Sequence, residues 1–397
     1  MAEQSTIAAV DLGSNSFHCQ IARVAGEQFF PLDSLREPVR LGAGLGKDKK
    51  LDDESQERAL ACLARFGERL RGFDPHGVRA IGTNTLRVAK NSKQFLRRAR
   101  AALGFPIEVV AGREEARLIY LGVSHSLPAS RDKRLVVDIG GGSTECIIGT
   151  GYKPLKLESL FMGCVSYSLR YFRDGRITKS ALKEADLAAR AELEPIVSSY
   201  IRGNWQQAVG SSGTIRSLAE ILQLCGHSDG PITLAGLDKL RSQLLRAGDM
   251  SSIELPGLRP DRQPVLIGGL AILYAVLDEL NIDEMTPAGF NVRTSVHEYG
   301  GGSFVVAGDI AYFANFKDQA LYLQPPDGPP QFFAGAPGAR FADLLVDAPR
   351  SRLIAVRELH AGDASEPFNS LVAIGLAMEQ LLGRLPAPPA SLSRPKH

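Results

Sequence analysis

The sequence predicts an α/β protein built from a duplicated unit. Two glycine-rich turns indicate the duplication, one opened by Asp11 and the other by Asp138. Each turn follows an apolar run rich in β-branched residues and precedes another such run, which is typical of a β-hairpin. Around both hairpins, strand-like runs alternate with apolar residues at helical spacing. We therefore expect two α/β halves, followed by a segment of different composition.

The first half is expected over residues 6–122 and opens with the hairpin Ile7–Val10 and Phe17–Val24. Apolar residues recur at helical spacing over 52–71 and predict a helix there. The other strands are expected at Arg36–Leu41, Val78–Gly82 and Ile107–Val110, and the other helices at Asn91–Leu103 and Glu114–Gly122.

The second half, residues 133–288, repeats this scheme. Strands are expected at Leu135–Asp138, Glu145–Gly149, Lys156–Phe161 and in a short run ending at Val209, and helices at 180–202, 214–224, 234–247 and 263–280.

The composition changes near residue 287, after which the chain is rich in proline and has no cysteine. Short strands separated by turns are expected there, at Ser303–Val306, Ile310–Phe313, Ala320–Leu323, Gln331–Phe333 and Leu353–Arg357. The pattern predicts α/β domains over 1–122 and 123–288, a β-rich segment over 289–380 and a disordered tail over 381–397.

Bulk properties exclude several classes of protein. The 397 residues suffice for two or three domains, and 44% apolar residues support sizeable cores. A net charge of +2 argues against nucleic-acid or acidic-membrane partners. The sequence contains no uninterrupted apolar run of about 18 residues, so a membrane span is not expected. The five cysteines form no CxxC pair and no signal peptide is evident, so we expect reduced thiols in a cytoplasmic protein.

Both hairpin tips carry residues that suit an anion, because glycine lets backbone N–H groups approach a ligand and hydroxyls add donors. The candidate phosphate-binding residues are Gly13, Ser14, Asn15 and Ser16 in the first tip, and Gly140, Gly141, Gly142, Ser143 and Thr144 in the second. The first tip could instead be a plain turn capped by Asp11. Three successive glycines in the second favour close approach of a ligand, and two such tips indicate a phosphate site between the halves.

A third candidate loop, residues 210–214, precedes an apolar helix. Backbone N–H groups at a helix N-terminus attract phosphate, although an ordinary N-cap explains the same residues equally well. The candidate phosphate contacts of this loop are Ser211, Ser212, Gly213 and Thr214.

Three carboxylates are candidate Mg²⁺ ligands. An aspartate at a strand end can hold Mg²⁺ or its waters, which applies to Asp11 and Asp138. Glu145 lies on the strand that returns from the second tip, so a hairpin would bring it to the same side as Asp138. A solvated strand end is the alternative for Glu145.

Glu114 and Glu115 open a predicted helix, where glutamates usually favour the helix dipole. The functional alternative is a general base that takes a proton from an attacking water. Arg87 follows a predicted strand, and its guanidinium could clamp a phosphate. His18 is more often a packed residue than a ligand at such a position, and the charges of Lys93–Arg100 are typical of a solvated helix face.

Together these residues resemble the exopolyphosphatase and guanosine-pentaphosphate phosphatase (Ppx/GppA) family, from Ala8 to about Glu284. The resemblance is carried by Ala9–His18, Gly82–Arg87, Glu114–Ile119, Asp138–Glu145, Met162–Ser166 and Ser212–Ile215. The Glu-Glu-Ala-Arg helix start, paired with the Gly-Gly-Gly-Ser-Thr-Glu tip, is specific to this family. The resemblance implies two ribonuclease H-like domains of the actin, sugar kinase and Hsp70 superfold with a cleft between them.

The resemblance further implies Mg²⁺-assisted hydrolysis of a terminal phosphoanhydride. Glu115 matches the catalytic base of the family, Asp138 and Glu145 match carboxylates of its metal site, and Arg87 and the three loops match its phosphate cradle. The expected substrate is inorganic polyphosphate or guanosine pentaphosphate, which the sequence does not separate. Family members often form homodimers through C-terminal regions that this chain lacks, so a homodimer stays an open alternative.

After residue 284 the chain departs from the family pattern. Phe290–Gly302, Tyr312–Gln319 and Arg352–Glu358 resemble one to two blades of the β-propeller of prolyl oligopeptidase-type peptidases, over about residues 289–374. No Gly-x-Ser-x-Gly elbow follows, so peptidase activity is not expected. Two other functions stay open. One is a catalytically impaired fusion that only binds, and the other is a sugar kinase or chaperone-type ATPase, against which the context of Glu115 argues.

Overall fold

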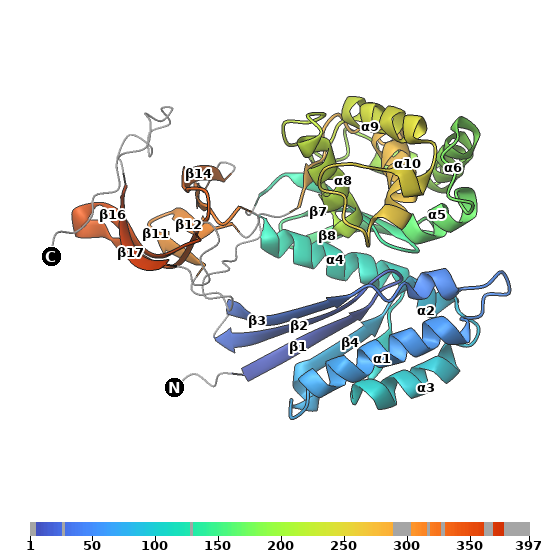
Figure 1. The fold of residues 1–397 in the computed structure, drawn as a ribbon, viewed down its shortest axis with the longest axis horizontal. Helices are drawn as coiled ribbons and strands as arrows, with labels where there is room; N and C mark the ends of the chain where they lie inside the picture. The colour runs from blue at the N-terminus through green and yellow to red at the C-terminus, as the bar shows by residue number, and fades with distance from the viewer. Residues whose placement is uncertain are drawn as a thin grey trace. The chain divides into compact units, whose positions relative to one another are not determined.

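The computed structural model describes residues 5–25, 28–127, 130–288, 303–315, 318–326, 330–360 and 368–376 (Figure 1). The chain divides into two compact units, residues 1–288 and 289–397. The first unit holds two α/β lobes and the second is all β in its described part.

The first lobe is a five-stranded sheet in the order β3-β2-β1-β4-β5. Its strands are β1 (Ser5–Leu12), β2 (Phe17–Ala25), β3 (Gln28–Glu37), β4 (Val78–Gly82) and β5 (Ile107–Val109). Strands β1 to β3 form an antiparallel meander, whereas β4 and β5 run parallel to β1. Helices α1 (Asp53–Arg69), α2 (Asn84–Val88) and α3 (Ser92–Leu103) accompany this sheet, and α1 and α3 lie side by side on one face (Figure 1). Phe17, Phe66 and Phe95 are fully buried in the core between this sheet and these helices.

The second lobe repeats the topology of the first, because its five-stranded sheet has the order β8-β7-β6-β9-β10. Its strands are β6 (Lys133–Ile139), β7 (Thr144–Thr150), β8 (Lys153–Leu160), β9 (Gln207–Ser211) and β10 (Thr286–Pro287). Again three antiparallel strands are followed by two parallel to the first of them. The predicted duplicated α/β fold is therefore confirmed.

Helices pack around the second sheet. They are α4 (Gly112–Ser126), α5 (Cys164–Tyr171), α6 (Lys179–Leu193), α7 (Val197–Tyr200), α8 (Ser212–Leu224), α9 (Leu234–Ala247) and α10 (Gln263–Glu279). Helix α10 is apolar on nearly all sides and buried throughout its middle, as expected for a helix surrounded by protein. No helix in the described residues is long and apolar enough to cross a membrane. The five cysteines are free thiols.

Helix α4 follows the first sheet in the chain but packs against the second. Ala116, Tyr120 and Val123 on its buried face share one apolar cluster with Val136 and Ile147 of the second sheet. The first turn of α4 is therefore held in a fixed place relative to β6 and β7.

Two predicted elements differ most from the structure in their bounds. The strand expected at Arg36–Leu41 ends at Glu37, because Arg40 adopts a left-handed backbone (φ 54°) that cannot continue a strand. The helix expected over 180–202 is broken between α6 and α7, where Pro195 removes a backbone donor. The short helices α2 and α5 were not predicted, nor were strands β15 and β17.

The second unit contains two small antiparallel sheets in its described residues. One is formed by β11 (Phe304–Ala307), β12 (Ile310–Ala314), β13 (Leu321–Gln324) and β14 (Gln331–Ala334), and the other by β15 (Ala339–Asp347), β16 (Arg352–Leu359) and β17 (Phe368–Gly375). The predicted β-rich character is confirmed. The resemblance to propeller blades stays a prediction, and its first motif, Phe290–Gly302, lies outside the described residues. The tail predicted over 381–397 lies outside them altogether.

The N-cap of α1 offers a simple test of helix stability. The Asp52 carboxylate accepts a hydrogen bond from Ser55 N at 2.7 Å and another from the Ser55 hydroxyl. We expect Asp52→Ala to lower the free energy of unfolding by about 1 kcal/mol, measured by urea denaturation. Asp53→Ala is the control, because this neighbour is not the N-cap and its loss should cost less. An equal loss for both variants would contradict the capping role.

Candidate active site

The three candidate anion loops, although distant in sequence, surround one cavity of about 350 Å³ in the first unit. Strand pairing explains part of this arrangement, because β6 and β9 run parallel with Asp138 opposite Ser211. Of the predicted phosphate-binding residues, those that line the cavity are Gly13, Ser14, Asn15, Ser16, Gly140, Gly141, Gly142, Ser143, Ser211, Ser212, Gly213 and Thr214. Asp11, Asp138 and Glu115 line it as well. Arg87, Thr144 and Glu145 are not among its lining residues.

The first two tips touch each other beside the cavity. A Cβ atom on Gly141 would lie 2.8 Å from Ser14 Cβ and 3.0 Å from Asn15 N. A Cβ atom on Gly142 would lie 2.5 Å from Asn84 Oδ1. These glycines are therefore required by the contact between the lobes, in addition to any approach of a ligand.

The third loop stores backbone strain at the start of α8. Ser212 has φ 79°, a left-handed conformation that is uncommon for residues other than glycine. Its hydroxyl accepts a hydrogen bond from Ile215 N at 3.2 Å, which caps the helix. Strain of this kind costs roughly 1–3 kcal/mol and is concentrated at functional sites. The capping contact is therefore present in this turn, and the anion contact of the loop stays a prediction.

The acidic residues of the cavity are buried close enough to repel one another. The pKa of Asp11 is raised to about 7, mainly by burial and also by the neighbouring carboxylates of Glu115 and Asp138. Burial also raises the pKa of Asp138 to about 6, against a hydrogen bond from Ser211 that lowers it. Such shifts mark a site that favours a bound cation or a shared proton.

Glu145 and Thr144 lie behind the second tip. Burial raises the pKa of Glu145 well above its usual value, and the charges of Glu115 and Asp138 add to this rise. Its Oε1 accepts a hydrogen bond from the Ser159 hydroxyl at 2.8 Å. Thr144 donates through its hydroxyl to Met162 O at 2.7 Å. In this structure both side chains support the tip from inside.

Arg87 contacts Glu115 directly. Its Nη1 lies 2.5 Å from Glu115 Oε2 and donates to Val110 O at 3.0 Å. Burial raises the pKa of Glu115, and the hydrogen bond and charge of Arg87 act against that rise. The predicted phosphate contact of Arg87 stays a prediction, whereas its contact with the candidate base is a new observation.

The chemistry of the donor set fits a magnesium ion. Asp11 Oδ1 is buried and has no hydrogen-bond partner in the described part of the chain, so a cation would satisfy it. The described residues contain no group of three or more acidic, histidine or cysteine side chains arranged to hold a metal alone. Magnesium in proteins is commonly held by one or two carboxylates, with water and phosphate oxygens completing the octahedron.

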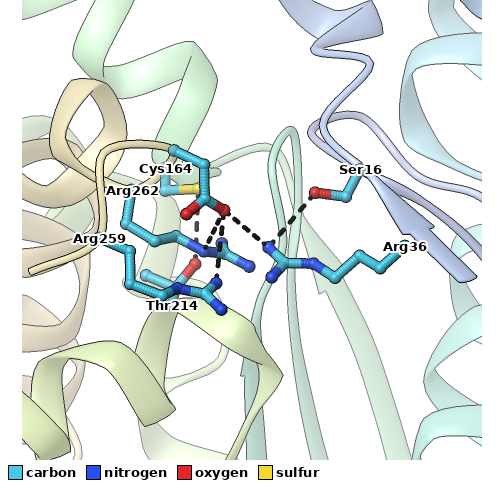
Figure 2. A network of polar contacts seen from close by, with 7 residues as sticks. Ser16, Arg36, Cys164, Thr214, Arg259 and Arg262 are labelled. Atoms are coloured by element: carbon cyan, nitrogen blue, oxygen red, sulfur yellow. Dashed lines mark hydrogen bonds and ion pairs between the residues drawn. The ribbon is translucent and has the colours of Figure 1, made fainter. Parts of the chain in front are cut away.

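Four arginines lie at the cavity or beside it, and none of them was predicted from the sequence as a site residue. Arg216 and Arg262 line the cavity. Figure 2 shows Arg36, Arg259 and Arg262 converging beside Cys164 and Thr214. Their guanidiniums lie 3.2, 3.3 and 3.6 Å from one carboxylate oxygen of Asp261. We call Arg36, Arg216, Arg259 and Arg262 the arginine cluster. The sequence signal was the pair of arginines flanking Pro-Asp just before α10.

The arginine cluster carries more positive charge than its carboxylate contacts in the described residues balance. One carboxylate faces three guanidiniums, and the charge of Arg36 adds to burial in lowering the pKa of Arg262 to about 10. The side chain of Arg262 is only 9% exposed. His18, also in the cavity lining, has its pKa lowered to about 4 by burial and by Arg36, Arg262 and Arg216. His18 is therefore neutral near pH 7.

The chain is similar to known proteins in sequence and in fold. Residues 20–297 match the model of the Ppx/GppA phosphatase family. An exopolyphosphatase-like protein is similar at 24% identity over 72% of this chain and 94% of its own, with a TM-score of 0.64. The exopolyphosphatase of Cytophaga hutchinsonii is similar at 24% identity, with 72% and 94% coverage and a TM-score of 0.63. The Aquifex aeolicus PPX-GPPA enzyme is similar at 25% identity, with 72% and 96% coverage and a TM-score of 0.59.

Proposed function

Because the chain belongs to the Ppx/GppA phosphatase family, we propose that it hydrolyses inorganic polyphosphate from the end, releasing orthophosphate. The two lobes have the actin-like fold of this family. The observation that carries the proposal is the arginine cluster beside the three loops, since it provides positive charge for more than one phosphate group.

The cavity supports a division of roles along a phosphate chain. The loops at 13–16, 140–143 and 211–214 provide backbone and hydroxyl donors for the terminal phosphoryl group. The arginine cluster then binds the following phosphates through charge-assisted hydrogen bonds. A chain of equal, negatively charged units suits this arrangement better than a small neutral ligand.

Glu115 is the proposed general base. Its carboxylate lines the cavity and accepts a proton from the water that attacks the terminal phosphorus. Arg87 holds the carboxylate in place, and its hydrogen bond and charge oppose the rise in the pKa of Glu115 that burial causes. The donors of the three loops stabilise the charge that develops on the phosphoryl oxygens, and the shortened polyphosphate leaves in line.

The bound cation would be held by Asp11 and Asp138, with Glu145 supporting the site from behind. When bound, magnesium neutralises charge on the phosphoryl oxygens of the transition state. We further propose that the protein works in the cytoplasm, where its free thiols stay reduced.

Orthophosphate release separates the candidate substrates. The full chain is incubated in Mg²⁺ buffer with long-chain polyphosphate, guanosine pentaphosphate or ATP, and phosphate is measured over time. We expect the highest kcat/KM with polyphosphate. Faster release from guanosine pentaphosphate would make that compound the assigned substrate and leave the assigned active site unchanged. Turnover of ATP alone would contradict the proposal. No release from any of them by the folded protein would favour a binding protein.

The Arg87–Glu115 contact predicts a change in pH dependence. In Arg87→Met the guanidinium that lowers the pKa of Glu115 is lost, so the acid limb of the kcat/KM profile should move to higher pH. The rate at neutral pH should fall about tenfold to a hundredfold, because the carboxylate is also less well oriented. Arg79→Met is the control, since Arg79 lies on the surface, 4.0 Å from Glu108. An unmoved acid limb would show that Arg87 does not act through Glu115.

A further inference from the structure

A second cavity, of about 380 Å³, lies along β8 on the second lobe. Its lining includes Arg113, Leu155, Lys156, Glu158, Ile196 and Tyr200. None of these residues lines the cavity of the three loops, so in the described part of the chain the two are separate. Its size lies within the usual range for sites that bind small molecules.

Tyr200 lines this cavity and carries a buried hydroxyl without a hydrogen-bond partner in the described residues. The residue is only 2% exposed, yet its hydroxyl has no hydrogen-bond partner among the described residues. Its backbone carbonyl is occupied, because Trp205 Nε1 donates to it at 2.6 Å. A buried hydroxyl without a partner costs roughly 1–3 kcal/mol, so such groups usually have a partner that protein contacts do not reveal.

The charges around the cavity favour an anion. Arg113 and Lys156 face a single carboxylate, that of Glu158, which Arg113 contacts at 3.0 Å. Lys156 Nζ donates to Ser199 O at 3.1 Å, which leaves its charge without a carboxylate partner in the contacts of the described residues. Apolar walls are supplied by Leu155, Leu157, Pro195 and Ile196.

The edge of the sheet is protected against an added peptide strand. β8 is the outer strand of its sheet in the described residues, and such edges can pair with another chain. Lys153, Pro154 and Lys156 lie on β8. Lysine and proline are the residues with which proteins block strand addition, so a small molecule fits this place better than a peptide.

We propose that this cavity binds a small organic anion, in which an anionic oxygen group is carried on an apolar body. The anionic oxygen accepts from the Tyr200 hydroxyl and lies near Arg113 and Lys156. The apolar body packs against Leu155 and Ile196. The proposal is independent of the substrate assigned to the first cavity.

Fluorine NMR on the full chain tests the chemical class. The probes are para-fluorobenzoate, para-fluorophenyl phosphate and the neutral para-fluorobenzyl alcohol, with saturating pyrophosphate present to occupy the first cavity. We expect at least one anion to bind at millimolar concentration or below, and the alcohol at least tenfold more weakly. Binding of benzoate alone identifies a carboxylate site, and binding of the phosphate ester alone a phosphate site. Absence of binding by both anions, or equal binding of the alcohol, overturns the proposal.

Two tyrosine variants locate the bound probe. Tyr200→Phe should weaken binding of the anion about tenfold, because one hydrogen bond to a charged group is lost. It should leave the melting temperature unchanged or higher, since no protein contact of the hydroxyl is removed. Tyr120→Phe is the matched control: its buried hydroxyl donates to Gly151 O at 3.0 Å, so it should lower the melting temperature and leave binding intact.

The contribution of the Arg113 guanidinium to binding is tested in the same way. Arg113→Gln should weaken binding of the anion about tenfold. Arg173→Gln, a change at an exposed arginine outside both cavities, should not. Unchanged affinity in both Tyr200→Phe and Arg113→Gln would place the probe elsewhere and overturn the site.

Discussion

Replacing Glu115 by glutamine is expected to lower kcat for orthophosphate release by about 10²- to 10⁴-fold. Glutamine has the same shape and can still accept from Arg87 Nη1 through its amide oxygen, so the contact at 2.5 Å survives in kind. It cannot accept the proton of the attacking water at neutral pH. The loss should therefore appear in kcat, with a much smaller change in KM, because the loops that bind phosphate are untouched.

The neighbouring glutamate provides a matched control. Glu114 lies in the same helical turn but pairs with Arg117 and is 43% exposed, and it does not line the cavity. Glu114→Gln should keep nearly full activity and the same thermal stability. Equal rates of orthophosphate release for Glu115→Gln and the unmodified protein would contradict the assignment of Glu115 as the base. A large loss of activity in Glu114→Gln would indicate damage to the helix instead.

The parts of the fold and of the candidate site that could be predicted are those that depend on short, continuous stretches of sequence. An aspartate, a glycine-rich turn and two flanking apolar runs stand next to one another at Asp11 and at Asp138, so each hairpin tip is a local signal. The repeated strand order follows from two such hairpins, each leading into helices and parallel strands. Glu115 was a candidate for the same reason, since helix starts are local.

The arginine cluster could not be predicted in this way. Arg36 lies on β3 and contacts Asp261, which lies two residues before the start of α10, so only tertiary folding joins them. The contact between Arg87 and Glu115 likewise joins two helices that are separate in sequence. The position of Glu145 behind the tip also depends on packing, because a strand pattern alone does not tell which alternate side chains are covered.

Asp11→Asn is expected to stabilise the metal-free protein at pH 8 while it abolishes most activity. The Asp11 carboxyl is buried, has a pKa of about 7 in the folded protein, and has an ordinary value of 3.8. A difference of this size corresponds to about 4 kcal/mol that the folded state loses when the group is forced to ionise. Asparagine carries no charge, so the variant avoids this cost. Its gain in stability is reduced by about 1–3 kcal/mol, because the buried amide atoms lack hydrogen-bond partners.

The sign follows from proton binding. Because the pKa is raised by folding, the folded state holds more protons than the unfolded state between about pH 4 and pH 7. Stability of the unmodified protein therefore falls as pH rises through this window, and the Asp11 contribution is lost above it. Asp11→Asn lacks that slope. Urea denaturation in EDTA should show the variant more stable at pH 8 and no more stable at pH 4, and a pH-independent difference would contradict the shifted pKa.

Magnesium should then offset most or all of the stability advantage of Asp11→Asn at pH 8. A cation that binds only the folded protein stabilises it by about 2.7 kcal/mol at a concentration of a hundred times its Kd. If Asp11 helps to hold the cation, Mg²⁺ raises the unfolding free energy of the unmodified protein and has little effect on Asp11→Asn. The buried carboxylate oxygen without a partner thus lowers the stability of the metal-free protein, and a bound cation would remove this loss. Equal stabilisation of both proteins by Mg²⁺ would show that the cation binds without Asp11, and the stored repulsion would then need another explanation.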